Sequence, residues 1–198
     1  MEITLLLFIF AAEILGEIHA FYVIFPFWDT VLHTLNGFLM AAIGLSLVNL
    51  LNKSDKLTFS LSPLFTAIVA FCFSMTIGVI WEMFEFGMDQ IFMLDMQKDT
   101  VIHQISSVLL DPKGGNTPYK IAGIKEVIVN GTEVGVGGYM DIGLIDTMYD
   151  LIVNFIGAAI FSVIGYYYVK NKDTTSIAER LIPKRKTEER DFWKQVNS

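Results

Sequence analysis

The sequence predicts an all-α transmembrane helical bundle of about four spans, with a small extracytoplasmic β-hairpin or meander insertion. The first observation is composition: of 198 residues, 53% are hydrophobic and 18% are charged, and the mean hydropathy is +0.52. This balance is typical of membrane proteins. The second is that four apolar segments are long enough to cross a hydrocarbon core of about 30 Å, which takes roughly 20 helical residues. The third is an alternating segment with a central Asn-Gly pair, which predicts a hairpin.

The four predicted spans cover about 3–24, 29–51, 63–88 and 146–169. The first begins with Glu2 and contains no Lys or Arg, so we interpret it as a membrane span and not as a signal peptide. Pro26 separates it from the second span, because proline interrupts a helix. Ser62 followed by Pro63 predicts the capped start of the third span.

Basic residues predict which side of the membrane each connection occupies. Lys53 and Lys56 lie in the loop 52–62, and further Lys and Arg residues gather in the tail from Lys170 onward. Loops rich in Lys and Arg stay in the cytoplasm. We therefore expect both termini and this loop inside the cell, and the connections 25–28 and 90–145 outside it.

The predicted outer connection carries the β structure. Residues 124–136, IKEVIVNGTEVGV, alternate around Asn130-Gly131, which is the strongest short hairpin signal. Residues 103–110, HQISSVLL, predict a third strand, and Asp111-Pro112 predicts a turn. The predicted organisation is then a bundle over 1–170, including the β insertion at about 100–142, and a charged cytoplasmic tail over 171–198.

Polar residues interrupt the apolar spans in narrow stripes. In residues 80–90, IWEMFEFGMDQ, the carboxylates of Glu82, Glu85 and Asp89 share one face, because a helix turns about 100° per residue. The other spans carry comparable stripes: Glu13 and Glu17; Asp29, His33 and Asn36; Asp146, Asp150 and Asn154.

All four stripes lie toward the predicted outer ends of their spans, with Glu13 nearest the middle. Ionisable residues inside membranes usually face the bundle interior and mark a functional site or pathway. The sequence therefore predicts one shared polar pocket just beneath the outer lipid head groups.

Several function classes find no support. The formal net charge of −7 disfavours a nucleic-acid partner. Cys72 is the single cysteine, so no internal disulfide is possible. No HExxH metal signature, nucleophilic Ser or Cys motif, or Gly-rich phosphate loop is present.

Three motifs in order carry a resemblance: WEMFE at 81–85, DMQKDT at 95–100 and DTMYDLIVNFIGA at 146–158, together with FWDTVLHTLNGF at 27–38. With these the chain resembles the YjdF-like bacterial inner-membrane proteins over most of residues 27–170. The resemblance implies a multi-pass protein of the bacterial inner membrane. It supplies no reaction, because the function of that family is unknown.

Three functions remain open from the sequence. The first is a divalent-metal site, with candidate ligands His33, Glu82, Glu85, Asp89, Asp146 and Asp150. Such a site would serve an enzyme acting on a lipid or small amphiphile, with His33, Glu82 and Asp150 as candidate catalytic groups. The second is a proton- or cation-coupled transporter that uses Glu13 and Glu17. The third is a structural polar plug that locks helix pairing. The expected partners are the lipid bilayer and, for a transporter above all, further copies of the chain.

Overall fold

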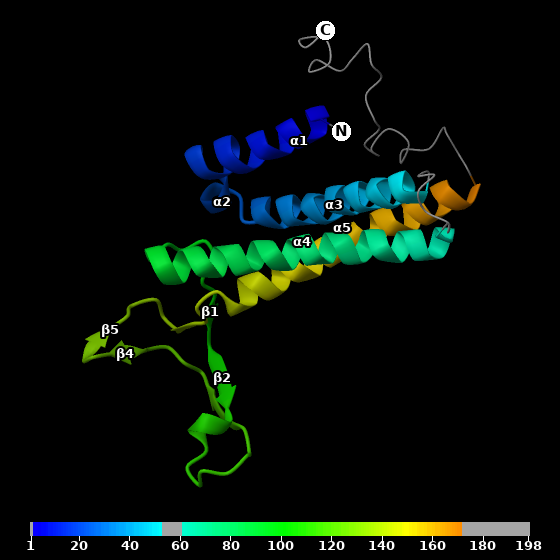
Figure 1. Ribbon diagram of the computed structural model, residues 1–198. Helices are drawn as coiled ribbons and strands as arrows, with labels where there is room; N and C mark the ends of the chain where they lie inside the picture. The colour runs from blue at the N-terminus through cyan, green and yellow to red at the C-terminus, as the bar shows by residue number, and fades with distance from the viewer. Residues whose placement is uncertain (1, 53–60, 172–198) are drawn as a thin grey trace. The chain divides into compact units, whose positions relative to one another are not determined.

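Three long apolar helices dominate the computed structural model, which describes residues 2–52 and 61–171 (Figure 1). They are α3 (Trp28–Asn52), α4 (Pro63–Phe92) and α5 (Leu144–Asn171), and each is long and apolar enough to cross a membrane. The predicted second, third and fourth spans are therefore confirmed as helices. At the start of α4 the Ser62 hydroxyl accepts a hydrogen bond from the Phe65 N–H at 3.3 Å, which confirms the predicted cap.

The first predicted span is not one continuous helix. It is not among the three helices of the described residues that are long and apolar enough to cross a membrane, so the fourth span stays a prediction. Residues 2–24 form α1 (Glu2–Ile9), the π-helix η1 (Phe10–Ile18) and the short α2 (Phe21–Ile24). Ala20 adopts a left-handed conformation with φ 56°, which ends η1 and turns the chain. Tyr22 then lies against Gly16, where an added Cβ would be 2.4 Å from its ring.

Helices α3 and α5 pack with their backbones in close contact. A Cβ on Gly37 would lie 2.1 Å from the Asn154 carbonyl oxygen, and a Cβ on Gly157 would lie 2.0 Å from the Thr34 carbonyl oxygen. Neither position can hold a side chain unless the helices separate. Small residues at such crossings are typical of membrane helix pairs.

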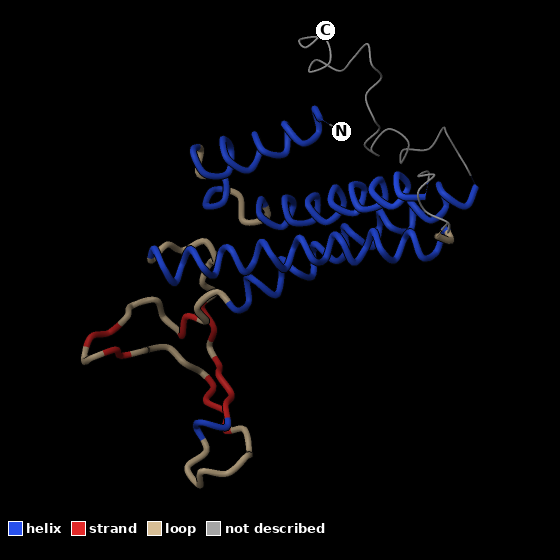
Figure 2. The backbone as a smooth tube through the Cα atoms, in the orientation of Figure 1, coloured by secondary structure: helices blue, strands red, loops and turns tan. Residues whose placement is uncertain are grey.

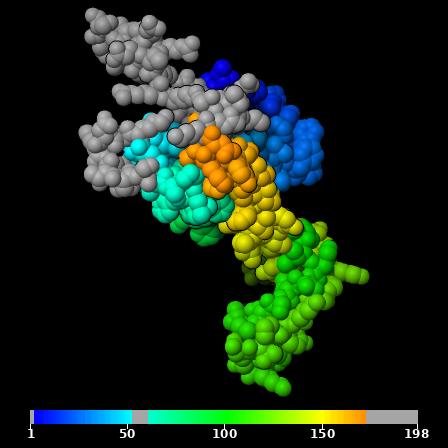
Figure 3. Space-filling view, turned by 90° about the vertical axis from the view of Figure 1, so that its right-hand side faces the viewer, coloured from blue at the N-terminus to red at the C-terminus, as the bar shows by residue number. Residues whose placement is uncertain are grey.

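Helix α4 runs antiparallel to the other two and is joined to them by polar and small residues. The buried Ser74 hydroxyl donates to the Gly37 carbonyl at 2.7 Å. The core contains Ala41, Ala42, Leu45, Ala70, Ala158 and Phe161. Figures 1 and 3 show the end of α5 beside the start of α4. Small core residues let the three helices approach closely, as dispersion-driven packing in lipid requires.

Residues Trp81–Tyr149 form a second compact unit, which contains the β insertion. Its strands are β1 (Val101–Ile102), β2 (Gln104–Ser107), β3 (Tyr119–Ala122), β4 (Ile128–Val129), β5 (Thr132–Glu133) and β6 (Tyr139–Met140). Figure 2 shows them as short red segments separated by loops. They pair as β1 with β6, β2 with β3, and β4 with β5, always antiparallel.

The hairpin prediction is confirmed, but the meander prediction is wrong. Asn130 and Gly131 both have positive φ, 50° and 81°, and connect β4 to β5 as a primed turn requires. The predicted third strand exists as β2, yet it pairs with β3 and not with the hairpin. The Asp111 carboxylate accepts the N–H groups of Lys113 and Gly115, which confirms the turn. The predicted loop residues 53–60 and tail residues 172–198 lie outside the described residues.

Candidate functional site

His33 lies between two carboxylates near the start of α3. Its Nε2 is 3.6 Å from Asp29 Oδ1, one helical turn earlier, and 3.8 Å from Asp150 Oδ2 on α5. His33 and Asp150 are buried, with relative exposures of 8% and 4%, and Asp29 is half-buried. Both carboxylates therefore face the same ring nitrogen of His33.

A polar contact lies one turn deeper between the same two helices. Asn36 Nδ2 donates to Asn154 Oδ1 at 3.3 Å, and Asn154 Nδ2 lies 3.6 Å from the sulfur of Met75 on α4. Asn154 is 1% exposed. It therefore links all three helices, which is the arrangement that the structural-plug hypothesis predicts.

The last turns of α4 carry two further buried carboxylates. Glu82 and Glu85 are 5% and 8% exposed, and their i, i+3 spacing places them on one helix face. The indole Nε1 of Trp81 donates to Glu85 Oε1 at 2.9 Å. The ring of Trp81 also contacts that of Phe84, with centroids 5.4 Å apart.

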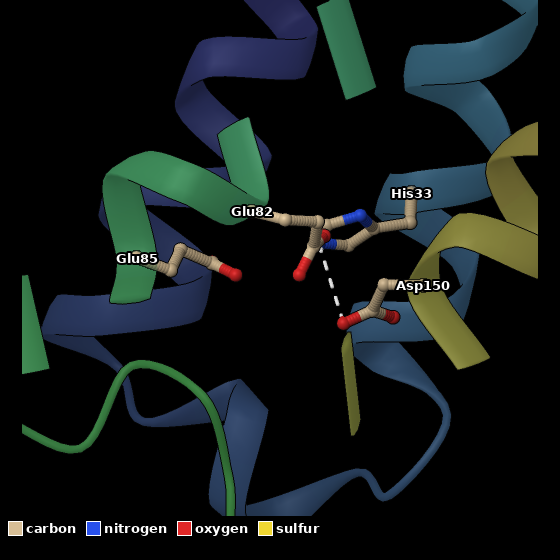
Figure 4. A group of neighbouring side chains, drawn as sticks. All are labelled: His33, Glu82, Glu85 and Asp150. Atoms are coloured by element: carbon tan, nitrogen blue, oxygen red, sulfur yellow. Dashed lines mark ion pairs between the residues drawn. The ribbon is translucent and has the colours of Figure 1, made fainter. Parts of the chain in front are cut away.

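Four of the predicted site residues come together. His33, Glu82, Glu85 and Asp150 each offer one ligand atom, and these atoms lie within 4.8 Å of one another (Figure 4). All four residues are buried. We call this group the His33 cluster. Asp29, Asp146 and Asp150 form a second group within the same distance limit, so Asp150 belongs to both groups.

One comparison with known proteins places this chain. A family model described as "Predicted membrane protein (DUF2238)" matches residues 1–171. The chain belongs to this family. The match agrees with the resemblance to the YjdF-like membrane proteins of unknown function. Together with the three apolar helices, it makes the chain a multi-pass membrane protein. Searches of curated proteins and of solved structures each returned no match.

Two of the candidate ligands in this family member make backbone contacts. Asp89 accepts the N–H groups of Met96 and Gln97 at 2.6 and 2.8 Å, just after α4 ends. Asp146 accepts the Lys98 N–H at 2.7 Å. Asp89 belongs to neither ligand group among the described residues. These carboxylates fix the course of the chain as it leaves α4 and enters α5.

The first span contributes nothing to the His33 cluster. Glu13 and Glu17 are exposed on η1, and neither belongs to a ligand group within the described ranges 2–52 and 61–171. The expected convergence of four stripes therefore reduces to α3, α4 and α5.

The sequence prediction left out two residues that matter here. Asp29 stands in a polar stripe but not among the predicted ligands, although it lies beside His33. Trp81 appears there as the first residue of the WEMFE motif and was given no role at the site. Its signal is the i, i+4 spacing to Glu85, which places a ring N–H one turn before the carboxylate.

Outside the helices, Asp99 is electrostatically strained. Partial burial raises the pKa of its carboxyl, and the neighbouring carboxylates of Asp95 and Asp141 raise it further. A raised pKa means that the ionised carboxylate is less favourable in the folded state than in the unfolded chain. This group therefore favours the folded insertion at low pH, and that contribution is lost as pH rises through its pKa. Because Asp99 is exposed, the effect on stability is small.

We expect Asp89→Ala to loosen residues 93–97 without unfolding the helices. The substitution removes a carboxylate that accepts two N–H groups, and charge-assisted bonds of this kind contribute about 1.5–3 kcal/mol each. Hydrogen exchange of the Met96 and Gln97 amides should accelerate about tenfold or more. Asp95→Ala is the matched control, because its exposed ion pair with Lys98 contributes little. Equal exchange rates in both variants would contradict the role of Asp89 in holding these two amides.

Proposed function

We propose that this multi-pass membrane protein binds one divalent metal ion through the His33 cluster. The observation that carries the proposal is that one imidazole and three carboxylates, all buried, place ligand atoms within 4.8 Å of one another. Donor atoms that share one ion at about 2.0–2.4 Å lie no more than about 4.8 Å apart. The side chains thus already have the spacing that a metal site needs.

Charge balance supports the same proposal. Three carboxylates beside one imidazole carry an excess of negative charge even when His33 is protonated. Helices α3 and α4 contain no Lys or Arg, and the one cation of α5 is Lys170, in its last turn. Buried carboxylates at short range must be relieved by protons or by a cation. A divalent ion neutralises the excess and at the same time uses the imidazole as a ligand.

The ligand types favour a first-row transition ion. Imidazole suits Zn²⁺, Fe²⁺, Ni²⁺ and Cu²⁺, and carboxylates also suit Mn²⁺, whereas Mg²⁺ and Ca²⁺ prefer sites made of oxygen alone. Metal sites in helical bundles also take inward-facing ligands from several helices, with two of them at i, i+3 on one helix, although that pair is Glu and His there and Glu82 and Glu85 here.

The test is metal content after purification. Protein loaded with Zn²⁺ or Mn²⁺ and then dialysed should retain about one ion per chain by elemental analysis. Glu82→Gln should lose most of it, while Glu133→Gln, an exposed carboxylate in β5, should retain it. Folded wild-type protein that keeps neither metal would overturn the proposal.

The reaction class that we propose for this site is metal-assisted hydrolysis of a lipid or small amphiphile. A bound ion would supply an activated water, and Asp29, which lies beside His33 without belonging to the His33 cluster, could then accept a proton from that water. The observation that supports catalysis is this half-buried carboxylate at the edge of the ligand group. Release of head groups from mixed lipid vesicles by metal-loaded protein, abolished by His33→Gln, is the expected result. Metal-loaded protein that releases no head group would overturn the proposed hydrolysis and leave metal binding as the function of the site.

The membrane topology is part of the same proposal. We infer that the connection containing Lys53 and the tail from Lys170 lie in the cytoplasm of a bacterial cell, and that the β insertion lies on the opposite side of the inner membrane. We also infer that residues 2–24 make a fourth passage despite their interrupted helix. A single cysteine introduced at exposed Asn130, in a Cys72→Ser background, should react with an impermeant maleimide in intact spheroplasts. Protection of that cysteine would reverse the orientation.

A further inference from the structure

We propose that Trp81 is a positioning and specificity residue of the His33 cluster, and that it restricts Glu85 to a single metal-binding oxygen. The inference rests on the proposed metal site. The indole Nε1 of Trp81 donates to Glu85 Oε1 at 2.9 Å, within one helix and at i, i+4 spacing. This is the contact that a metal ligand typically receives from its surroundings: a second hydrogen bond that fixes its orientation.

The geometry of Trp81 suits that role. Its ring contacts that of Phe84, and its N–H points along the helix toward Glu85. Glu85 itself is buried, and its long side chain would otherwise lose considerable rotamer entropy on binding an ion. The Trp81 N–H, one turn earlier in the helix, orders the Glu85 side chain before an ion binds.

The hydrogen bond also bears on which ion is chosen. A carboxylate oxygen that accepts an indole N–H is a poorer metal ligand, which leaves the other oxygen to bind. Ca²⁺ takes six to eight oxygens and commonly uses carboxylates in bidentate fashion, whereas Zn²⁺ is satisfied by four single contacts. By limiting Glu85 to one oxygen, Trp81 disfavours Ca²⁺ and favours a small four-coordinate ion.

The experiment compares Zn²⁺ and Ca²⁺ binding to full-length protein in detergent by calorimetry. Trp81→Phe should weaken Zn²⁺ binding about 10- to 100-fold, the usual effect of losing a contact to a metal ligand. Binding of Ca²⁺ should fall less or improve, so the preference for Zn²⁺ narrows. Trp28→Phe is the matched control, because its indole donates to the Ala11 carbonyl and not to a ligand.

The outcomes separate the two proposals. Wild-type protein that binds no divalent ion overturns the metal site and the role of Trp81 together. Wild-type protein that binds Zn²⁺, with Trp81→Phe binding it equally well and with unchanged selectivity, overturns the role of Trp81 alone.

A second readout applies even if Trp81→Phe does not fold. Zn²⁺ should change the fluorescence of a Trp28→Phe, Trp193→Phe protein, in which Trp81 is the one tryptophan left, because the ion binds the carboxylate that the indole contacts. Glu85→Gln in the same background should remove the change. A signal that survives Glu85→Gln would overturn the inference.

Discussion

Gly157→Ala is expected to destabilise the bundle by about 1–3 kcal/mol, in spite of the higher helix propensity of alanine. The added Cβ would lie 2.0 Å from the Thr34 carbonyl oxygen, which belongs to the backbone of α3 and cannot rotate away. The helices would have to separate, and every contact along their crossing would weaken. Thermal unfolding in detergent, followed by loss of helical circular dichroism, measures the effect.

Gly87→Ala is the control for that experiment. Gly87 lies in α4, and a Cβ there would meet nothing within 4 Å. This substitution should leave stability unchanged or raise it by up to about 1 kcal/mol through helix propensity. The two alanines are therefore expected to act with opposite signs. A Gly157→Ala protein as stable as Gly87→Ala would contradict the close crossing of α3 and α5.

Zn²⁺ is expected to stabilise the wild-type protein against heat, and Asp150→Asn is expected to abolish that gain. A ligand present at about 100 times its dissociation constant adds about 2.7 kcal/mol to folding. Asp150 faces His33 and belongs to both ligand groups, so its loss should weaken binding more than that of any other single carboxylate. Melting curves with and without Zn²⁺ give the increment directly.

Asn154→Ala separates metal binding from helix locking. Asn154 connects α3 to α4 without belonging to a ligand group, so its loss should lower the melting temperature but preserve the Zn²⁺ increment. If the polar residues serve only as a structural plug, both variants lower stability and the wild type gains nothing from Zn²⁺. If the Asp150→Asn protein gains as much stability from Zn²⁺ as the wild type does, the ion binds at another site.

The main helices could be predicted because their signals are local and repeated. Long apolar runs define α3, α4 and α5, and the 3.6-residue period places Glu82 with Glu85 and Asp29 with His33. The meeting of His33 with Asp150 also followed, since both stand in the second turns of helices that run in the same direction. Helices that cross a membrane in the same direction begin at the same membrane face, so residues near their starts lie at a similar depth.

What could not be predicted depends on contacts distant in sequence or on backbone detail. Hydropathy records that residues 2–24 are apolar, but not that Ala20 turns the chain through a left-handed conformation. The pairing of β2 with β3 is decided by how the loop after Leu110 folds back. The Asn-Gly turn was visible because its residues are themselves the determinant.

The length of α4 has a consequence for how an ion would arrive. Its 30 residues extend about 45 Å, well beyond a hydrocarbon core of about 30 Å. Glu82 follows Pro63 by a rise of about 29 Å, so a helix that starts at one boundary of the hydrocarbon carries this carboxylate to the other. Cations concentrated by anionic phospholipid could then load the protein from the aqueous border, with no permeation route through the bilayer.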